Sequence, residues 1–294
     1  MFAAIINIFA VPFGYVMSFI YGLFHSYGLS IIIFSLLAKA AMTPMTLKQK
    51  RSSLSTLKIQ PQMQALQKKY KNDKQKYNEE VQKLYAESGV SPMAGCGSTL
   101  MTLPIMTGLY YVIAKPLTYF MRLTAAQITD IFARFGLEVS NNFTAEINVA
   151  QKIFDNFDKV ADIGDNILKV DFHFLGINLA ATPDFKTFNL LWIIPILSGL
   201  SAMVFSLVQR HMQNKLTETP VQMPGGNLMI FMMPLVSLYF GFILPAGLGL
   251  YWITNNLLSI ALEYILTWYF KKYKSDELPQ ATGKKKKDKG VSLQ

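Results

Sequence analysis

The chain has 294 residues, of which 51% are hydrophobic and only 16% charged, and 28 Lys and Arg against 18 Asp and Glu give a formal net charge of +10. Soluble domains carry about 25% charged residues, so the composition argues against a soluble enzyme or binding domain and favours a membrane protein. The single cysteine, Cys96, excludes an intramolecular disulfide.

The N-terminal segment is apolar and uncharged. Residues 1–38 contain no Lys, Arg, Asp or Glu, and Pro12 and Gly14 interrupt the apolar run. The segment lacks the basic region that opens a secretory signal peptide. We therefore interpret residues 1–26 as an amphipathic interfacial helix that lies on the membrane. A sixth membrane span is the alternative for this segment.

Five later segments are long and apolar enough to cross roughly 30 Å of hydrocarbon as helices. They lie at residues 28–47, 98–120, 188–209, 228–245 and 247–270. The sequence therefore predicts an all-α integral membrane protein with a five-helix transmembrane bundle. Residues 27–120 form the first two core spans with an intervening hairpin, and residues 188–270 form core spans three to five. Only Pro245-Ala246-Gly247 separates the last two spans, which predicts a tight hairpin.

The loop charges predict the orientation. Residues 48–90 hold 10 Lys and Arg against 4 Asp and Glu, and residues 271–294 hold 8 against 3. Residues 121–187 instead hold 6 Lys and Arg against 9 Asp and Glu. Because basic loops stay in the cytoplasm, the N-terminus is predicted outside and the C-terminus in the cytoplasm.

The inner loop, residues 48–90, is predicted to be a cytoplasmic helical hairpin. Pro61 is expected to start a new helical segment, and Asn72-Asp73 is expected to form the turn. Apolar residues follow helical spacing on both sides of that turn: Met63, Leu66, Tyr70, Tyr77, Val81, Leu84 and Tyr85. This stripe is interpreted as the seam of the hairpin, whereas a partner-binding role would use the basic outer face.

The two remaining segments lie on opposite sides of the membrane in this topology. Residues 121–187 are predicted to form a small extracytoplasmic insert with helical pieces near 124–135 and 145–160. Residues 271–294 are predicted to be a disordered basic cytoplasmic tail.

Catalytic and metal-binding signatures are missing from the sequence. It contains no P-loop, no His-Glu-x-x-His, no Gly-x-Ser-x-Gly and no cysteine pair. His25, His173 and His211 fall at different depths of the predicted topology. We therefore expect no enzyme activity, no cofactor and no metal site.

Lys39 is the outstanding residue of the first span. It lies among apolar and small residues, where a charge costs about 2.5–3.5 kcal/mol on insertion scales. Such a group must find water, a counter-ion or the membrane surface. Ser35 lies one turn earlier and shares its face.

The last span carries a matching polar stripe. Its members are Trp252, Asn256, Ser259 and Glu263 at helical spacing, with Asn255 beside them. These groups should face inward or line a cavity. Two interpretations follow for Lys39: it pairs with Glu263 and holds the bundle together, or it stands in a hydrated groove and attracts acidic residues of a passing peptide.

Several motifs resemble the YidC/Oxa/Alb family of membrane protein insertases, in order over roughly residues 7–270. The matching motifs are Tyr27-Gly28-Leu29-Ser30-Ile31-Ile32-Ile33, Pro44 with Lys48-Gln49-Lys50-Arg51-Ser52-Ser53, Leu57-Lys58-Ile59-Gln60-Pro61-Gln62-Met63, Val90-Ser91-Pro92-Met93-Ala94-Gly95-Cys96, Leu103-Pro104-Ile105, Phe174-Leu175-Gly176-Ile177-Asn178-Leu179 and Pro245-Ala246-Gly247-Leu248-Gly249-Leu250-Tyr251-Trp252. The enlarged outer insert interrupts the match. We expect residues 1–294 to contain no counterpart of the large periplasmic domain of some members.

The resemblance implies a groove that is open to the cytoplasm and to lipid. Lys39 occupies the position where that family normally has arginine, so it keeps the charge but lacks the fork of guanidinium donors. Ser35 and Trp252 fall at groove-lining positions, and Ser206 falls where glutamine is common. The resemblance further implies a multi-pass protein of the bacterial inner membrane that inserts and helps fold nascent membrane proteins.

The resemblance and the distribution of basic residues also imply binding partners. The substrates are nascent membrane proteins, and a Sec-type translocon is a further candidate partner. Lys284, Lys285, Lys286, Lys287 and Lys289 are predicted to contact ribosomal RNA, together with the hairpin; attraction to anionic membrane lipids is the alternative. A small-solute transporter and a purely structural bundle, or a folding chaperone without insertion activity, remain the other functional classes.

Overall fold

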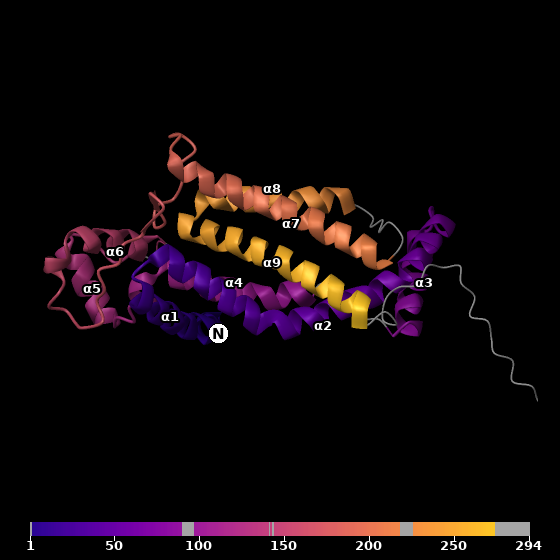
Figure 1. Cartoon of the computed structure of the whole chain (residues 1–294), viewed down its shortest axis with the longest axis horizontal. Coiled ribbons are helices and arrows are strands. Elements are labelled where there is room, and N and C mark those ends of the chain that lie inside the picture. The colour runs from indigo at the N-terminus through magenta and orange to yellow at the C-terminus, as the bar shows by residue number, and fades with distance from the viewer. Residues whose placement is uncertain (1, 90–96, 141, 143, 218–225, 274–294) are drawn as a thin grey trace, which may run out of the picture. The chain divides into compact units, whose positions relative to one another are not determined.

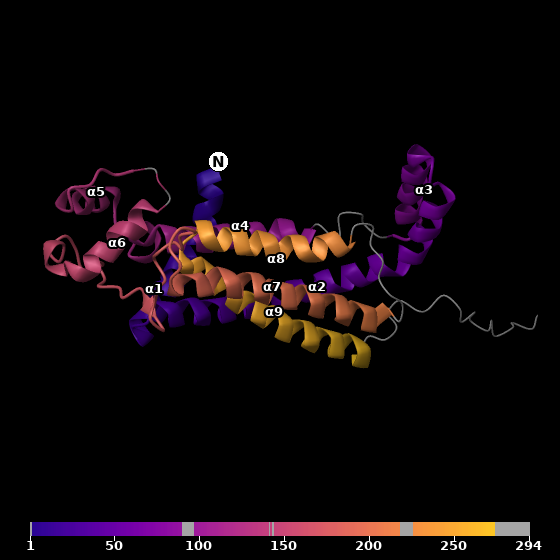
Figure 2. The same cartoon turned by 90° about the horizontal axis from the view of Figure 1, so that it is seen from above.

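The computed structural model describes residues 2–89, 97–140, 142, 144–217 and 226–273. Figures 1 and 2 show its α-helices: α1 (Phe2–Phe24), α2 (Tyr27–Lys69), α3 (Lys74–Glu87), α4 (Gly97–Ala114), α5 (Ala125–Arg134), α6 (Ala145–Asp155), α7 (Ile193–Thr217), α8 (Gly226–Ile243) and α9 (Ala246–Tyr273). The chain divides into two compact units. Unit 1 comprises Met1–Thr43, Ser98–Leu207 and Gly225–Ala261; unit 2 comprises Pro44–Gly97, Val208–Pro224 and Leu262–Gln294.

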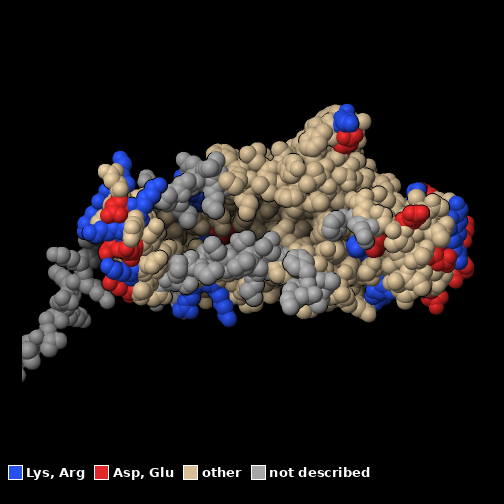
Figure 3. Space-filling view, turned by 180° about the vertical axis from the view of Figure 1, so that it is seen from behind, with Lys and Arg blue, Asp and Glu red and all other residues tan. Residues whose placement is uncertain are grey.

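The helices carry the apolar surface expected of a membrane protein. Within the described ranges, three helices are long and apolar enough to cross a membrane: Ile6–Phe24, Tyr27–Lys69 and Leu190–Leu216. Pro104–Ala114 and Ile230–Ile243 are shorter apolar helices. Helix α9 is not among these helices. Its polar residues Asn255, Asn256 and Glu263 lower its mean hydropathy. Figure 3 shows charged side chains gathered over the α2–α3 hairpin and over the insert, whereas α8 carries none. The number of spans and their orientation stay predictions.

Helix α1 buries one stripe and exposes another that is equally apolar. Ala10 and Met17 are fully buried, whereas Ile8, Phe19 and Leu23 are at least 60% exposed. The helix runs steeply across the direction of α2 and α4 (Figure 2). The exposed apolar face suits contact with hydrocarbon rather than water, a contact that either an interfacial helix or a sixth membrane span would make. Its placement in the bilayer stays a prediction.

Helix α2 runs without interruption through Pro44 and Pro61. The expectation that Pro61 starts a new segment is therefore wrong. A proline removes one backbone hydrogen bond and bends a helix, but packing on both sides can keep the helix continuous. Leu57 and Ile59 are buried just before Pro61, and Leu66 faces α3 just after it. The first predicted span and the first arm of the hairpin are consequently one helix.

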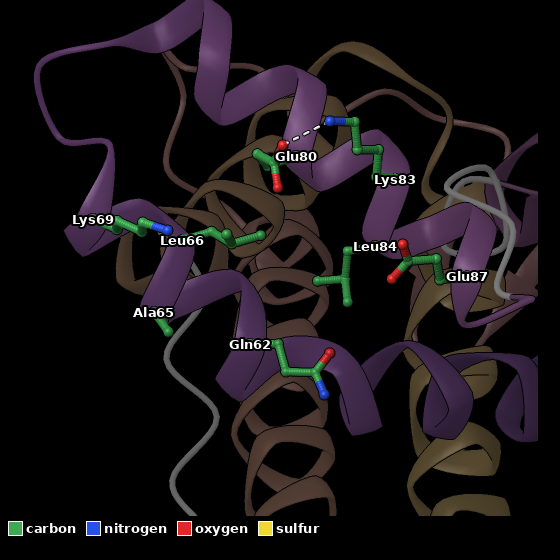
Figure 4. Close-up of a pocket in the computed structure, with 8 residues that line it drawn as sticks. All are labelled: Gln62, Ala65, Leu66, Lys69, Glu80, Lys83, Leu84 and Glu87. Carbon is green, nitrogen blue, oxygen red and sulfur yellow. Dashed lines mark hydrogen bonds and ion pairs between the residues drawn. The ribbon is translucent and has the colours of Figure 1, made fainter.

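The hairpin reverses its direction where the sequence predicted a turn. The turn ends at Asn72, and the Asp73 side chain caps α3 by accepting a hydrogen bond from the backbone N–H of Lys76 at 2.9 Å. Figure 4 shows Leu66 of α2 and Leu84 of α3 in one pocket between the arms. These two residues of the predicted apolar stripe therefore belong to the hairpin's own seam.

The second predicted span, residues 98–120, is not a single helix. Helix α4 ends at Ala114, and a short π-helix, η2 (Pro116–Phe120), follows Lys115. Pro116 has no N–H group to continue the α-helical hydrogen bonds. The helix therefore ends there, and the chain turns into the insert.

The insert contains the two predicted helical pieces and two elements that the sequence did not indicate. Helix α5 begins with a capping box in which Thr124 and Gln127 bond each other's backbone. Helix α6 ends at Asp155, before the short 3₁₀ helix η3 (Phe157–Lys159). Strands β1 (His173–Phe174) and β2 (Ile177–Asn178) pair antiparallel, which adds a small ribbon to the predicted all-α fold. Leu175 and Gly176 form its turn with positive φ angles of 51° and 79°.

Within unit 1, α7 contacts both α8 and α9 at glycines, through Pro195 at Gly241 and Ile194 at Gly249. The 3₁₀ helix η4 (Leu190–Trp192) precedes α7, so α7 begins later than predicted and extends further, to Thr217. Only Leu244 and Pro245 separate α8 from α9, which confirms the tight link. The N–H groups of Ala246 and Gly247 donate to carbonyls of the segment after β2, at 2.9 and 2.7 Å.

Two groups of predicted features lie outside the described residues. The motif from Val90 to Cys96 is one, and residues 274–294 of the predicted tail, with Lys284 to Lys287 and Lys289, are the other. The domain boundaries inferred from sequence therefore stay predictions.

Candidate functional site

The site begins with Lys39, which is half-buried on α2 in unit 1. Its Nζ donates hydrogen bonds to Asn255 Oδ1 at 3.2 Å and to Ser259 Oγ at 2.5 Å, both on α9. Both acceptors are neutral, so these bonds solvate the ammonium without cancelling its charge. The structure thus brings together three of the predicted site residues.

The two acceptors are themselves linked along α9. Ser259 Oγ donates to the backbone carbonyl of Asn255 at 2.6 Å, one turn earlier. This bond leaves the oxygen lone pairs of Ser259 directed at other donors. Helical periodicity therefore aligns an amide oxygen and a hydroxyl oxygen into one receptor for a cation.

Glu263 lies on the same helical stripe but has another partner. It accepts a hydrogen bond from Lys50 of α2, and both side chains are only 8% exposed. The alternative that pairs Glu263 with Lys39 is therefore wrong. Sequence reasoning missed Lys50 because it counted this residue in the inner loop. The sequence could have indicated Lys50 by its spacing of eleven residues from Lys39, about three helical turns, which places both lysines on one face of a helix.

Asn256 belongs to a second polar seam, which joins α9, α7 and α8 within unit 1. Its Nδ2 donates to Ser201 Oγ at 3.0 Å, and Ser201 Oγ donates to the carbonyl of Ser198 at 3.0 Å. The hydroxyls of Ser198 and Ser237 lie 2.7 Å apart. The three serines were missed; the spacing Ser198-x-x-Ser201 on one helical face was the available signal.

The remaining predicted residues make local contacts. Ser35 is 2% exposed, and its hydroxyl donates to the carbonyl of Ile31 at 2.7 Å. Ser206 donates in the same way to the carbonyl of Ala202 at 2.9 Å. The ring centroids of Trp252 and Phe240 lie 6.1 Å apart. The contacts of these three residues do not join them to Lys39.

A separate polar contact lies in the insert. Glu146 of α6 accepts from the backbone N–H of Thr118 at 2.9 Å and from its hydroxyl at 2.8 Å. Burial raises the pKa of the Glu146 carboxyl, while the bonds from Thr118 and the charge of Lys115 oppose that shift. Sequence reasoning missed this contact because it joins residues far apart in the chain.

No cluster suited to metal binding is found in the part of the chain that the structure describes. Among those residues, no group of three or more His, Cys, Asp and Glu could hold a metal ion. The described site therefore offers hydrogen-bond donors and acceptors and one half-buried cation. Such a set can bind and orient polar groups in apolar surroundings.

Comparison with known proteins identifies similar chains. The family model described as 60Kd inner membrane protein matches residues 19–274. Membrane protein insertase YidC of Treponema denticola is 29% identical over 261 residues, which cover 88% of this chain and 37% of the relative. ALBINO3-like protein 1, chloroplastic, of Arabidopsis thaliana is 30% identical over 254 residues, which cover 83% of this chain and 44% of the relative.

A third relative is closer in length. Membrane protein insertase YidC of Fusobacterium nucleatum is 27% identical over 241 residues, which cover 82% of this chain and 86% of the relative. The chain thus spans less than half of the first two relatives and most of the third.

Proposed function

Because the chain belongs to the YidC/Oxa/Alb family, described as 60Kd inner membrane protein, we propose that it is a membrane protein insertase and folding chaperone. Its substrates are the hydrophobic segments of nascent membrane proteins. Its apolar helices suit a multi-pass protein of the inner membrane. A Sec-type translocon and the ribosome are the partners proposed with this activity.

One observation carries the proposal: the half-buried ammonium of Lys39 on a helix apolar enough to span the membrane. The neutral oxygens of Asn255 and Ser259 hold it. An isolated charge at such a place is expensive, and a purely structural role is better served by apolar packing. A cation held by neutral acceptors is instead available to a negatively charged partner.

In the proposed mechanism, a hydrated groove shortens the stretch of hydrocarbon that a polar flank of the substrate must cross. A nascent chain must carry a polar flank across hydrocarbon, where each unsatisfied polar group costs several kcal/mol. In a hydrated groove, Lys39 attracts Asp or Glu of that flank, while Asn255, Asn256 and Ser259 offer hydrogen bonds. The apolar segment then leaves sideways into lipid, where burial of apolar surface drives the transfer.

The test is insertion into proteoliposomes of a substrate with one hydrophobic segment and an acidic flank. Lys39→Ala is expected to slow insertion roughly tenfold or more, because a hydrogen bond to a charged group contributes about 1.5–3 kcal/mol and each 1.4 kcal/mol is about a factor of ten. Lys39→Arg keeps the charge and should retain most activity. Lys48→Ala, which removes an exposed cation from the same helix, is the matched control.

A second substrate isolates the charge effect. Replacing the acidic flank by Asn and Gln should remove most of the difference between wild-type protein and Lys39→Ala. Undiminished insertion of several acidic-flank substrates by Lys39→Ala would remove Lys39 from the mechanism.

Other functional classes make different predictions. A structural bundle predicts no crosslink from Ser35 or Trp252 to a stalled nascent span, whereas an insertase predicts one. A transporter predicts flux of small solutes into vesicles, which the insertase hypothesis does not require.

A further inference from the structure

The segment before α7 forms a loop that projects sideways from the beginning of that helix (Figure 1, top left). It comprises residues 182–192, all within unit 1. Neither the polar seam nor the Lys39 site uses this loop. Its surface is unusual because several large apolar side chains are exposed next to charged ones.

An aromatic cluster fastens the loop to the end of α8. Phe185 stacks on Phe242 with ring centroids 4.1 Å apart and an interplanar angle of 25°. Trp192 packs edge-on against Phe242 at 4.9 Å, and Phe188 lies 5.2 Å from Trp192. Such ring pairs add to the energy of area burial, so the loop is held in place.

Hydrogen bonds within the loop hold its backbone and the Trp192 side chain in place. The indole N–H of Trp192 donates to the carbonyls of Asp184 at 2.9 Å and Thr187 at 3.1 Å. The side chain of Asn189 accepts from the N–H of Leu191 at 3.0 Å. The exposure of the aromatic side chains is therefore not the result of a loose loop. A defined conformation presents them outward.

The exposed apolar surface is large and continues onto α7. Phe188 is 84% exposed, Phe185 58% and Leu190 57%. Further along the helix, exposed apolar residues recur at spacings of three and four: Ile193, Ile196, Leu197, Leu200, Val204 and Leu207. This recurrence is one continuous helical stripe on a helix apolar enough to span the membrane.

The position of the loop next to an apolar span indicates which medium contacts its exposed apolar side chains. The candidate membrane span Leu190–Leu216 includes η4 and nearly all of α7. Phe188 precedes its first residue by two positions, where a span of that extent would meet the membrane surface. Aromatic residues are enriched at that level because a ring sits well between headgroups and acyl chains. Asp184 and Lys186 are exposed on the same loop and supply the polar side that such a placement needs.

We propose that the loop 182–192 is a membrane anchor whose ligand is the lipid interface of the bilayer. Phe185, Phe188 and Leu190 lie among the upper acyl chains, and Asp184 and Lys186 stay at the aqueous edge. Because Phe185 and Trp192 also pack against Phe242, the anchor sets the depth in the membrane at which α7 begins and α8 ends. The Lys39 insertion mechanism can fail without affecting this inference.

Site-directed spin labelling tests the anchor in the full-length protein. Cys96→Ser removes the single cysteine, and single cysteines are then introduced as Phe188→Cys, Asp184→Cys, Leu200→Cys and Asp165→Cys. Each labelled protein is reconstituted into phosphatidylcholine–phosphatidylglycerol vesicles. Collision with oxygen, which concentrates in lipid, is compared with collision with a water-soluble nickel chelate. Leu200 is the lipid-facing reference and Asp165 the aqueous reference.

The label at position 188 is expected to show a several-fold higher ratio of oxygen to nickel accessibility than the label at 184, approaching that at 200. The label at 184 should resemble that at 165. Leu190→Cys repeats the measurement at a second exposed position, in case the label at 188 disturbs the ring contact with Trp192. If labels at 188 and 190 are as accessible to nickel as that at 165, the loop faces water and a protein partner becomes its occupant.

Discussion

At the scale of single residues, two lysines on one helix differ in how the structure accommodates them. Lys39 donates to neutral oxygens of Asn255 and Ser259, whereas Lys50 pairs with the carboxylate of Glu263. A charge with neutral partners still attracts an anion, and a charge with a buried carboxylate partner is largely neutralised. Lys39 is therefore the proposed substrate contact, and Lys50 has a structural role.

Removing one member of the Lys50–Glu263 pair should destabilise the protein strongly. Glu263→Gln leaves a buried ammonium without its counter-ion, which costs about 3–5 kcal/mol. The double replacement Lys50→Met with Glu263→Leu should recover most of that loss, because well-packed apolar groups often replace a buried pair without penalty. Thermal unfolding in detergent of Lys50→Met, of Glu263→Leu and of the double variant completes the double-mutant cycle. Additive losses would contradict a direct pair.

Glu146 should make the stability of the insert depend on pH. Burial raises its pKa, so the folded state holds the proton over a range in which the unfolded state has lost it. Stability from this group is therefore lost as pH rises from the ordinary glutamate range to the raised pKa. Glu146→Gln removes the titration, so its unfolding temperature relative to wild type should rise across that window. Glu138→Gln, at an exposed position in the insert, is the control for removing a carboxylate from the insert.

At the scale of elements, helix contacts in unit 1 depend on small residues and on polar seams. A Cβ added to Gly241 of α8 would lie 2.8 Å from the Cα and the Cβ of Pro195 on α7. Backbone and ring atoms cannot move aside easily. The close approach of α7 and α8 also brings Ser198 and Ser237 to 2.7 Å. Packing of small residues and interhelical hydrogen bonds are the main attractions between helices in lipid.

Gly241→Ala should therefore separate α7 from α8 and destabilise the protein by about 1–3 kcal/mol, the usual range for an overpacked site. Gly22→Ala is the matched control, because an added Cβ there meets no atom within 4 Å. That substitution should be neutral or stabilise α1 by up to about 1 kcal/mol, since alanine favours helix. Thermal unfolding in detergent compares the two variants. Equal changes in unfolding temperature would show that helix propensity, and not the contact with Pro195, determines the effect of Gly241→Ala.

At the scale of the whole molecule, charge distribution carries the predicted orientation and partners. Residues 48–90 and 271–294 are strongly basic, and residues 121–187 are acidic on balance. Basic segments on one side of a membrane attract RNA phosphates or anionic lipid headgroups. Both kinds of attraction weaken with salt, so salt dependence alone does not distinguish them.

Deleting residues 280–294 should lower co-sedimentation of the reconstituted protein with ribosomes and flatten its salt dependence, because fewer counter-ions are released from RNA. Replacing Lys284 to Lys287 and Lys289 by Gln should reproduce the deletion, and replacement by Arg should not. Vesicles of neutral and of anionic lipid separate the two sources of attraction. Unchanged ribosome binding after deletion would assign the tail to the membrane.

The sequence by itself determined where the helices of this protein lie and which of their faces are polar. Apolar runs of sufficient length, the break at Pro245 and the spacing from Trp252 to Glu263 are local properties. Local hydrogen bonds and side-chain periodicity depend on neighbours within a few residues. The α8–α9 link and the two helical pieces of the insert were accordingly predictable.

Only the tertiary structure decided which polar groups meet. It gave Glu263 to Lys50 instead of Lys39, joined Asn256 to Ser201, and kept α2 continuous through Pro61. These outcomes depend on the rotation and crossing of helices that are distant in sequence. Packing sets both quantities through side chains on all of the contacting helices, and the periodicity of one segment does not contain that information.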